Sequence, residues 1–260
     1  MQRTTFLASL TAAGAGSLLP SARADAALDE VAVGAEVFAG LRSDGEILFD
    51  SPFYEHLNEI GSVIATTVRS RYPHPIRYYV VKGESANAFA VPGGNIYINE
   101  PLLDLAKNKD EVAGVLAHET GHMVLHHVAK SIANQQRVGT VAQIGSILAQ
   151  VFAGPLIGAG ADVALGQMQN AQDANLSRHI EAQADEEGAR IIAATNAFNP
   201  YGMVWFFQTM TATYGPSQAN WMRSHPIDQQ RIDDLQRLFA SDPVTFGKFK
   251  DTQQRGVAYW

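Results

Sequence analysis

The pentapeptide His118-Glu119-Thr120-Gly121-His122 constrains this chain more than any other feature of its sequence. It lies within a helical pattern, where residues four apart are about 40° apart around the axis, so the two imidazoles converge on one point. Zinc binds such a pair of imidazoles, and the glutamate between them projects beside the metal. The motif therefore predicts a zinc centre carried by a helix.

The third ligand of such a centre must come from elsewhere in the chain. Because there is no cysteine, it must be a histidine or a carboxylate. Metzincins use a histidine six residues after the motif, but Leu125 and Val128 occupy the glycine and histidine positions of that pattern. A glutamate on a separate helix is the other common ligand, and Glu181 and Asp185 share one face of a helix expected at 177–195.

Glu181 can complete a site of two histidines and one glutamate with an open position for water, and Asp185 can accept a hydrogen bond from a ligand imidazole. Without the zinc motif, the same pair would be interpreted as a solvated acidic face. His126, one further turn along, is too far up the axis to share the ion, and we interpret it and His127 as polar residues at a helix end.

Composition narrows the class of protein. The chain has 260 residues, 46% of them hydrophobic, which is enough for a sizeable core. Its formal net charge of −7 has the wrong sign for a protein that neutralises phosphates, so no nucleic-acid partner is expected. No linker marks a second domain, and we expect a single domain over residues 25–260.

Residues 1–24 resemble a secretory signal peptide. Arg3 precedes an apolar stretch from Phe6 to Leu19, and Ala22-Arg23-Ala24 fits an A-x-A cleavage site. The apolar stretch is shorter than the roughly 20 residues of a spanning helix, although an uncleaved anchor is the alternative. Cleavage after Ala24 would leave an acidic protein exported to the bacterial periplasm.

Hydrophobic periodicity predicts a mostly α protein with a small antiparallel β-sheet, which is the α+β class. The helices are expected at 53–68, 110–131, 177–195 and 199–214, with a last amphipathic helix from about 227 to 239, and the strands at 76–82, 87–91 and 95–99. Residues 138–161 carry no charge but are interrupted by glycines and Pro155. They are expected to form a packed helical hairpin; a segment that touches the membrane peripherally or gates the substrate, and a true span, are the alternatives.

Several motifs in one order resemble the HtpX and CAAX-prenyl-protease type of zinc metallopeptidases, Oma1-like exported and mitochondrial members included. The motifs are Asn87-Ala88-Phe89-Ala90 with Pro92-Gly93-Gly94, Glu111 to His127, Ser177-Arg178 with Glu181 to Gly188, and Ser224-His225-Pro226 with Arg231. The resemblance covers most of residues 50–240. Integral-membrane members have several spanning helices, so the exported soluble branch fits this chain better, without the helical-repeat domain of some members.

The resemblance implies a gluzincin fold with one zinc ion on His118, His122 and Glu181, Glu119 as catalytic base, and Asp185 behind the ligands. It also implies that His225 and Arg231 lie near the zinc, where they steady the oxyanion or, for His225, fill the open position in a resting form. The strand Asn87, Ala88, Phe89 and Ala90 would be the edge along which an extended substrate lies.

The expected function is that of a zinc-dependent endopeptidase. Zinc would activate a water molecule and Glu119 would take its proton as the water attacks a peptide carbonyl. The resemblance suggests misfolded or misassembled envelope proteins as substrates, and leaves the oligomeric state open. The main alternative is a periplasmic quality-control binding protein or chaperone that keeps the zinc site but cuts rarely; a membrane-surface protein with a chance zinc motif is a third.

Overall fold

The computed structural model describes residues 28–134, 171–215 and 220–252, so the predicted signal peptide and the uncharged segment at 138–161 lie outside it. The described part is mostly helical with one small sheet, which confirms the predicted α+β class. In chain order, the helices and strands are α1 (Glu30–Ser43), α2 (Tyr54–Val68), β1 (Arg77–Val81), β2 (Ala88–Val91), β3 (Asn95–Asn99), α3 (Glu100–Leu105), α4 (Lys109–Val124), α5 (His127–Asn134), α8 (Ala171–Thr195), α9 (Tyr201–Tyr214), α10 (Asn220–Ser224), α11 (Gln229–Ser241) and α12 (Pro243–Phe246).

The three strands form a mixed sheet in the order β1-β3-β2. β2 and β3 pair antiparallel, as predicted, around Gly93 and Gly94, whose φ angles of +92° and +103° suit glycine. β1 pairs parallel with β3, with Tyr79 opposite Tyr97, so the prediction of antiparallel pairing is wrong for these two strands. The reason is that β3 lies between β1 and β2. β1 therefore pairs with β3 and not with β2, the strand that follows it in the sequence.

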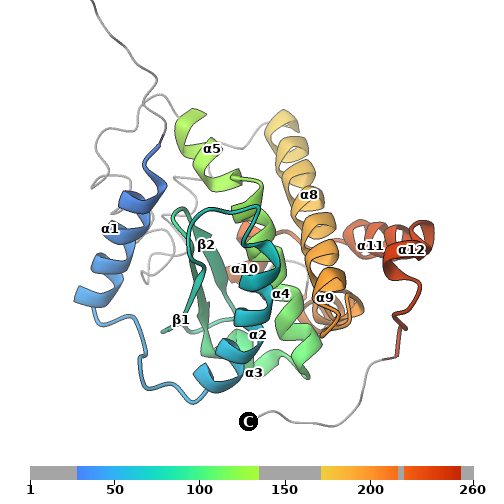
Figure 1. The fold of residues 1–260 in the computed structure, drawn as a ribbon, viewed down its shortest axis with the longest axis horizontal. Helices are drawn as coiled ribbons and strands as arrows, with labels where there is room; N and C mark the ends of the chain where they lie inside the picture. The colour runs from blue at the N-terminus through green and yellow to red at the C-terminus, as the bar shows by residue number, and fades with distance from the viewer. Residues whose placement is uncertain (1–27, 135–170, 216–219, 253–260) are drawn as a thin grey trace, which may run out of the picture.

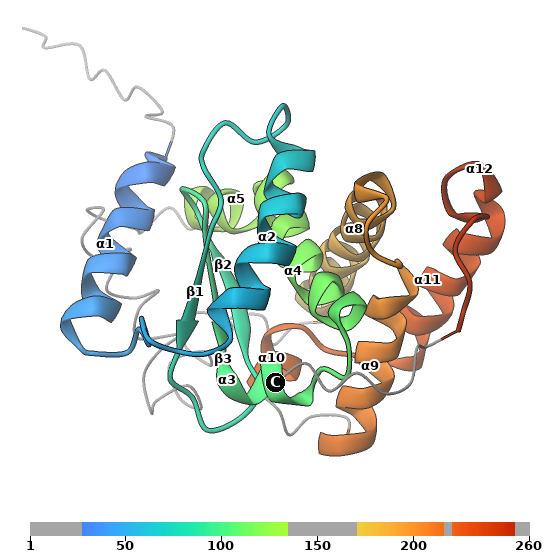
Figure 2. The same ribbon diagram turned by 60° about the horizontal axis from the view of Figure 1, so that its bottom comes forward.

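Alternate strand residues point to opposite faces of the sheet, and each face has its own apolar core. On one face, Phe89 and Tyr97 pack with α1 residues such as Val37. On the other face, Ile96 and Ile98 belong to the larger core that continues through the remaining helices. Figure 2 shows α1 on one side of the sheet and α2 and α4 on the other, with α8, α9, α11 and α12 beyond them.

α4 is the central helix of the molecule, and it packs against α2, α8 and α9 (Figure 1). The Asn108 side chain caps its N-terminus by accepting a hydrogen bond from the backbone nitrogen of Glu111 over 3.0 Å. Every residue from Glu111 to Val124 is buried, so the helix has no solvent-facing stripe. The zinc motif therefore lies in the interior, surrounded by packed elements that can supply further ligands.

Two predicted helices differ from the observed ones by more than two residues at one end. The helix expected over 110–131 breaks at His126, whose φ of 56° is left-handed, and α5 starts at the next residue. His126 is drawn toward α1, where its Nδ1 lies 2.7 Å from a carboxylate oxygen of Glu30. The helix expected at 177–195 begins earlier, at Ala171. Of the helices within the described ranges, none has the length and apolar character that crossing a bilayer requires.

Candidate active site

α4 presents His118 and His122 one turn apart on the same helical face. Their Nε2 atoms lie 3.1 Å apart, and the two residues are 0% and 6% exposed. A neutral imidazole has one nitrogen that donates a hydrogen bond and one that only accepts. Two buried ring nitrogens that point at the same place are typical of a metal-binding pair, because an ion between them can bind both.

α8 crosses α4 closely enough to bring a carboxylate to these imidazoles. The approach depends on two glycines: a Cβ on Gly121 would lie 2.9 Å from a carbonyl oxygen of α8, and one on Gly188 would lie 3.0 Å from the backbone nitrogen of His118. The Glu181 carboxylate consequently lies 3.4 Å from His118 Nε2 and 3.5 Å from His122 Nε2.

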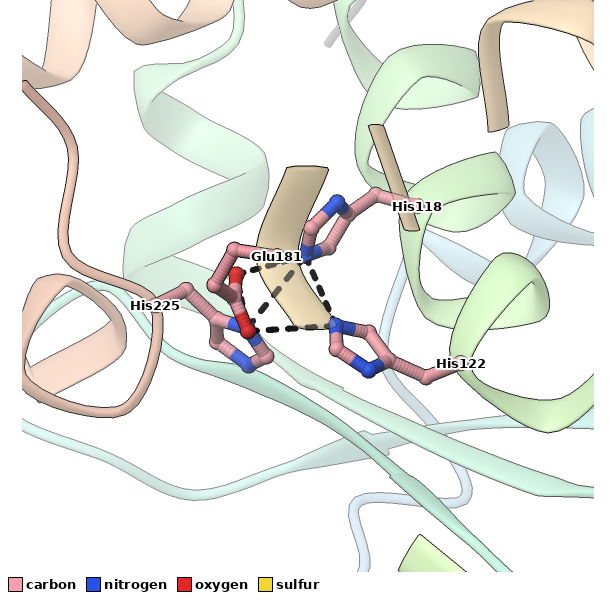
Figure 3. A group of neighbouring side chains, drawn as sticks. All are labelled: His118, His122, Glu181 and His225. Carbon is pink, nitrogen blue, oxygen red and sulfur yellow. Dashed lines mark hydrogen bonds and ion pairs between the residues drawn. The ribbon is translucent and has the colours of Figure 1, made fainter. Parts of the chain in front are cut away.

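The fourth member of the cluster is His225, which follows α10. Its Nδ1 lies 3.0 Å from Glu181 Oε2 and 3.3 Å from His118 Nε2. Figure 3 shows the three rings and the carboxylate converging, and one ligand atom from each residue lies within 4.8 Å of all the others. In a tetrahedral site with zinc bonds of about 2.0–2.1 Å, neighbouring ligand atoms are about 3.4 Å apart. The separations that join His118 and Glu181 to each other and to the other two rings are 3.0–3.5 Å, close to this value, and fit one zinc ion.

Asp185 and Arg231 lie behind the cluster. Asp185 Oδ1 is 2.9 Å from His118 Nδ1, and because a carboxylate only accepts, Nδ1 carries the proton and Nε2 is left to face the centre. Arg231 donates to both oxygens of Asp185 over 2.7 Å, and its Nη1 lies 3.2 Å from Glu181 Oε2. The buried guanidinium thus orients both carboxylates.

The charges of the centre favour a bound cation. Burial alone would raise the pKa of Glu181, but the neighbouring imidazoles and the guanidinium lower it well below its usual range. Burial alone would lower the pKa of His118, but hydrogen bonds with Asp185 and Glu181 raise it to about 9. Burial lowers the pKa of His122 well below its usual value, which keeps that ring neutral. The negative charges of Glu181 and Asp185 therefore favour a cation beside the ring nitrogens, and a divalent ion bound there would supply it.

Glu119, between the two histidines, is 1% exposed. Its Oε1 accepts a hydrogen bond from the indole nitrogen of Trp221 over 3.0 Å and lies 3.6 Å from His225 Nε2. Its Oε2 is buried and has no hydrogen-bond partner among the residues that the structure describes. A buried carboxylate oxygen in that state is a natural acceptor for a proton or a water molecule at the centre.

Residues 54–238, which contain every member of this cluster, match the family model described as Peptidase family M48. The chain belongs to peptidase family M48. At the level of the family, this match and the buried cluster confirm the predicted zinc metallopeptidase and its zinc cofactor.

This M48 chain is 30% identical to "Beta-barrel assembly-enhancing protease" of Yersinia pestis over 233 residues, which are 85% of this chain and 47% of the relative. It is 25% identical to "Metalloprotease YcaL" of Escherichia coli over 222 residues, 82% of this chain and 81% of the relative. It is 29% identical to "Mitochondrial metalloendopeptidase OMA1" of Schizosaccharomyces pombe over 161 residues, 59% of this chain and 44% of the relative. The chain thus spans less than half the length of the beta-barrel assembly-enhancing proteases that it matches, 47% and 40% for two of them.

The residues that the M48 resemblance assigns to substrate lie at the edge of the sheet. Ala88, Phe89 and Ala90 belong to β2, which pairs only with β3 among the described strands, and Asn87 directly precedes them. All four are at most 8% exposed, and β2 lies against both α4 and α1.

Sequence reasoning missed two residues that contact the centre. His127, expected only as a polar residue at a helix end, is buried with its Nδ1 3.0 Å from His122 Nδ1. Trp221 donates to Glu119 and lies beside the ring of His225, with 5.1 Å between centroids. The sequence held only spacings as signals for these two residues. His127 comes five residues after His122, and Trp221 comes one helical turn before His225, which would place it beside that histidine.

Proposed function

We propose that the chain is a zinc-dependent endopeptidase whose zinc ion is held by His118, His122 and Glu181. One observation carries this proposal: the converging, buried ligand atoms lie beside Glu119, one carboxylate oxygen of which has no hydrogen-bond partner in the described part of the chain. The ligand set of two histidines and one glutamate leaves a position for water or substrate.

A bound zinc ion would polarise the scissile carbonyl and lower the pKa of a water molecule. We assign the proton transfers to Glu119: Oε2 accepts the proton of the attacking water and later passes it to the leaving amine, which yields two shorter peptides. Asp185 holds the Nδ1 proton of His118, and Arg231 holds Asp185 and Glu181 in place. Because the guanidinium is engaged in this way, we assign it an orienting role, and its contact with an oxyanion stays a prediction.

His225 has two proposed states. With Nδ1 among the ligand atoms, it would fill the fourth position of the zinc ion in a resting form. Displaced by substrate, it could donate to the tetrahedral oxyanion. The same contacts favour a second candidate function, in which the chain binds unfolded proteins as a quality-control factor and rarely cuts them.

We propose proteins or peptides in an extended conformation as substrates, laid along the β2 edge by main-chain pairing. Since the strand is almost fully buried, the segments that cover this edge must move aside for a peptide to bind. We propose misfolded or misassembled envelope proteins as the substrate class; the Yersinia pestis relative is named for the assembly of beta-barrels, and the sequence of residues 1–24 supports export to the periplasm.

The test is cleavage of unfolded casein, with and without 1,10-phenanthroline, by the wild-type chain and by Glu119→Gln and His225→Ala. The proposal expects chelator-sensitive cleavage that falls by at least about 100-fold in Glu119→Gln, with zinc content unchanged. Zinc without cleavage in the wild type, but cleavage in His225→Ala, would favour the locked resting form. Zinc without cleavage in every variant would support the binding protein, and cleavage retained by Glu119→Gln would contradict the assigned base.

A further inference from the structure

Trp221 reaches the centre with the only hydrogen-bonding group of its side chain. The indole Nε1–H donates to Glu119 Oε1 over 3.0 Å, and the two residues are 0% and 1% exposed. An indole donates only, so it pairs well with a carboxylate. Hydrogen bonds to charged acceptors are stronger than neutral ones, and burial strengthens them further.

Trp221 is itself held firmly. Its backbone nitrogen donates to the carbonyl oxygen of Ala86 over 3.0 Å, which ties α10 to the segment preceding β2. Its ring packs against Phe206 and Phe207, with centroid distances of 5.7 and 5.8 Å. It also stands edge-on to the ring of His118 at 5.6 Å. The indole therefore cannot leave Glu119 without repacking of the core around it.

The two oxygens of Glu119 differ because of this contact. The last torsion of a glutamate is broad, so an unrestrained carboxylate turns and exchanges its two oxygens. Here Oε1 is held by the indole, while Oε2 has no hydrogen-bond partner within the described residues. We propose that Trp221 is a positioning residue of the hydrolytic reaction, whose indole holds Oε1 of Glu119 so that Oε2 faces the attacking water. This inference rests on the proposed function, in which Glu119 is the general base.

The first arm of the test compares Trp221→Phe with Trp205→Phe as a matched control. Trp205 of α9 is also buried and also donates its indole hydrogen to a carboxylate, Asp251 Oδ1, over 2.7 Å. Loss of one hydrogen bond to the base predicts that Trp221→Phe lowers kcat by about 10- to 150-fold with KM changed by less than about threefold. Trp205→Phe should keep wild-type kcat, and both variants should keep one zinc per chain.

The second arm needs neither cleavage nor a folded Trp221 variant. The chain has three tryptophans, so removal of the Trp205 and Trp260 indole signals by substitution to phenylalanine assigns the remaining ¹H–¹⁵N signal to Trp221. A bond to a carboxylate shifts that proton downfield and protects it from exchange. In Glu119→Gln, the Trp221 signal should move upfield and exchange faster, while the Trp205 signal stays in place.

The two arms separate the failure of this inference from the failure of the proposed function. An active wild type with unchanged kcat in Trp221→Phe would overturn the positioning role and leave the peptidase standing. A Trp221 signal that does not respond to Glu119→Gln would overturn it as well, whether or not the chain cleaves casein. A rise in KM with constant kcat would also contradict it, since that pattern belongs to substrate binding.

Discussion

The contact between α4 and α8 at Gly188 links the fold to the metal centre and can be tested with a single methyl group. In Gly188→Ala, the new Cβ would lie 3.0 Å from the backbone nitrogen of His118 and 2.9 Å from the terminal methyl of Met203. Met203 can turn away because its side chain is flexible, whereas the backbone of α4 cannot.

The size of the effect follows from these distances. Non-bonded heavy atoms prefer separations of about 3.5–4.0 Å, so the two helices must part by about 0.5–1 Å at this point. Such overpacking costs about 1–3 kcal/mol, and the better helix propensity of alanine offsets about 1 kcal/mol of it. We expect unfolding free energy to fall by no more than about 2 kcal/mol. Glu181 is two turns away on the same helix, and a shift of about 0.5 Å is enough to spoil a metal site, so zinc affinity should fall by about 10- to 100-fold.

The assay is zinc affinity by competition with a chromophoric chelator, with urea unfolding measured alongside. Gly114→Ala is the matched control, because its Cβ would lie 2.8 Å from backbone atoms of Met203 and would clash with α9 instead of α8. It should lower stability by a similar amount and leave zinc affinity close to wild type. Unchanged zinc affinity in Gly188→Ala, or an equal loss in both variants, would refute the reasoning.

Three further predictions concern the groups around the ligands and the zinc ion itself. Asp185→Asn removes the charged acceptor behind His118, and titration should show a zinc affinity lower by about 10- to 100-fold with the fold intact by circular dichroism. Arg231→Met leaves Asp185 buried without its cationic partner, and urea unfolding should show a loss of about 3–5 kcal/mol. Arg190→Met, which removes more exposed ion pairs on α8, should have a much smaller effect. Removal of zinc with a chelator should lower Tm by about 5–10 °C relative to a sample with free zinc near 100 times Kd. The reason is that the ion would link α4, α8 and the segment after α10. An unchanged Tm would contradict this prediction.

The parts of the molecule that were predictable from sequence are those set by local periodicity. The apolar spacing over 53–68 predicted α2, and the glycines after Val91 predicted the β2–β3 hairpin. The spacing of His118 and His122 predicted their convergence because a helix allows no other arrangement. Glu181 and Asp185 were identified by the same geometry, since both lie on one face of α8.

The parts that were missed depend on contacts between distant residues. The expected helix over 110–131 did not allow for the break at His126, whose side chain contacts Glu30, 96 positions away. The parallel pairing of β1 with β3 depends on which strand lies in the middle of the sheet. Trp221 meets Glu119 across 102 positions, so its spacing could place it beside His225 but could not indicate the contact with Glu119. Local rules identified the candidate ligands, whereas the contacts of Glu119, the proposed base, depend on the tertiary fold.

The measurement that tests the central claim most directly is the zinc K-edge X-ray absorption spectrum of the purified wild-type chain. The account predicts one zinc ion per chain with nitrogen and oxygen ligands at about 2.0–2.1 Å, and with imidazole scattering from two or three histidines. Absence of zinc, or a zinc ion whose spectrum shows no histidine ligands, would contradict it.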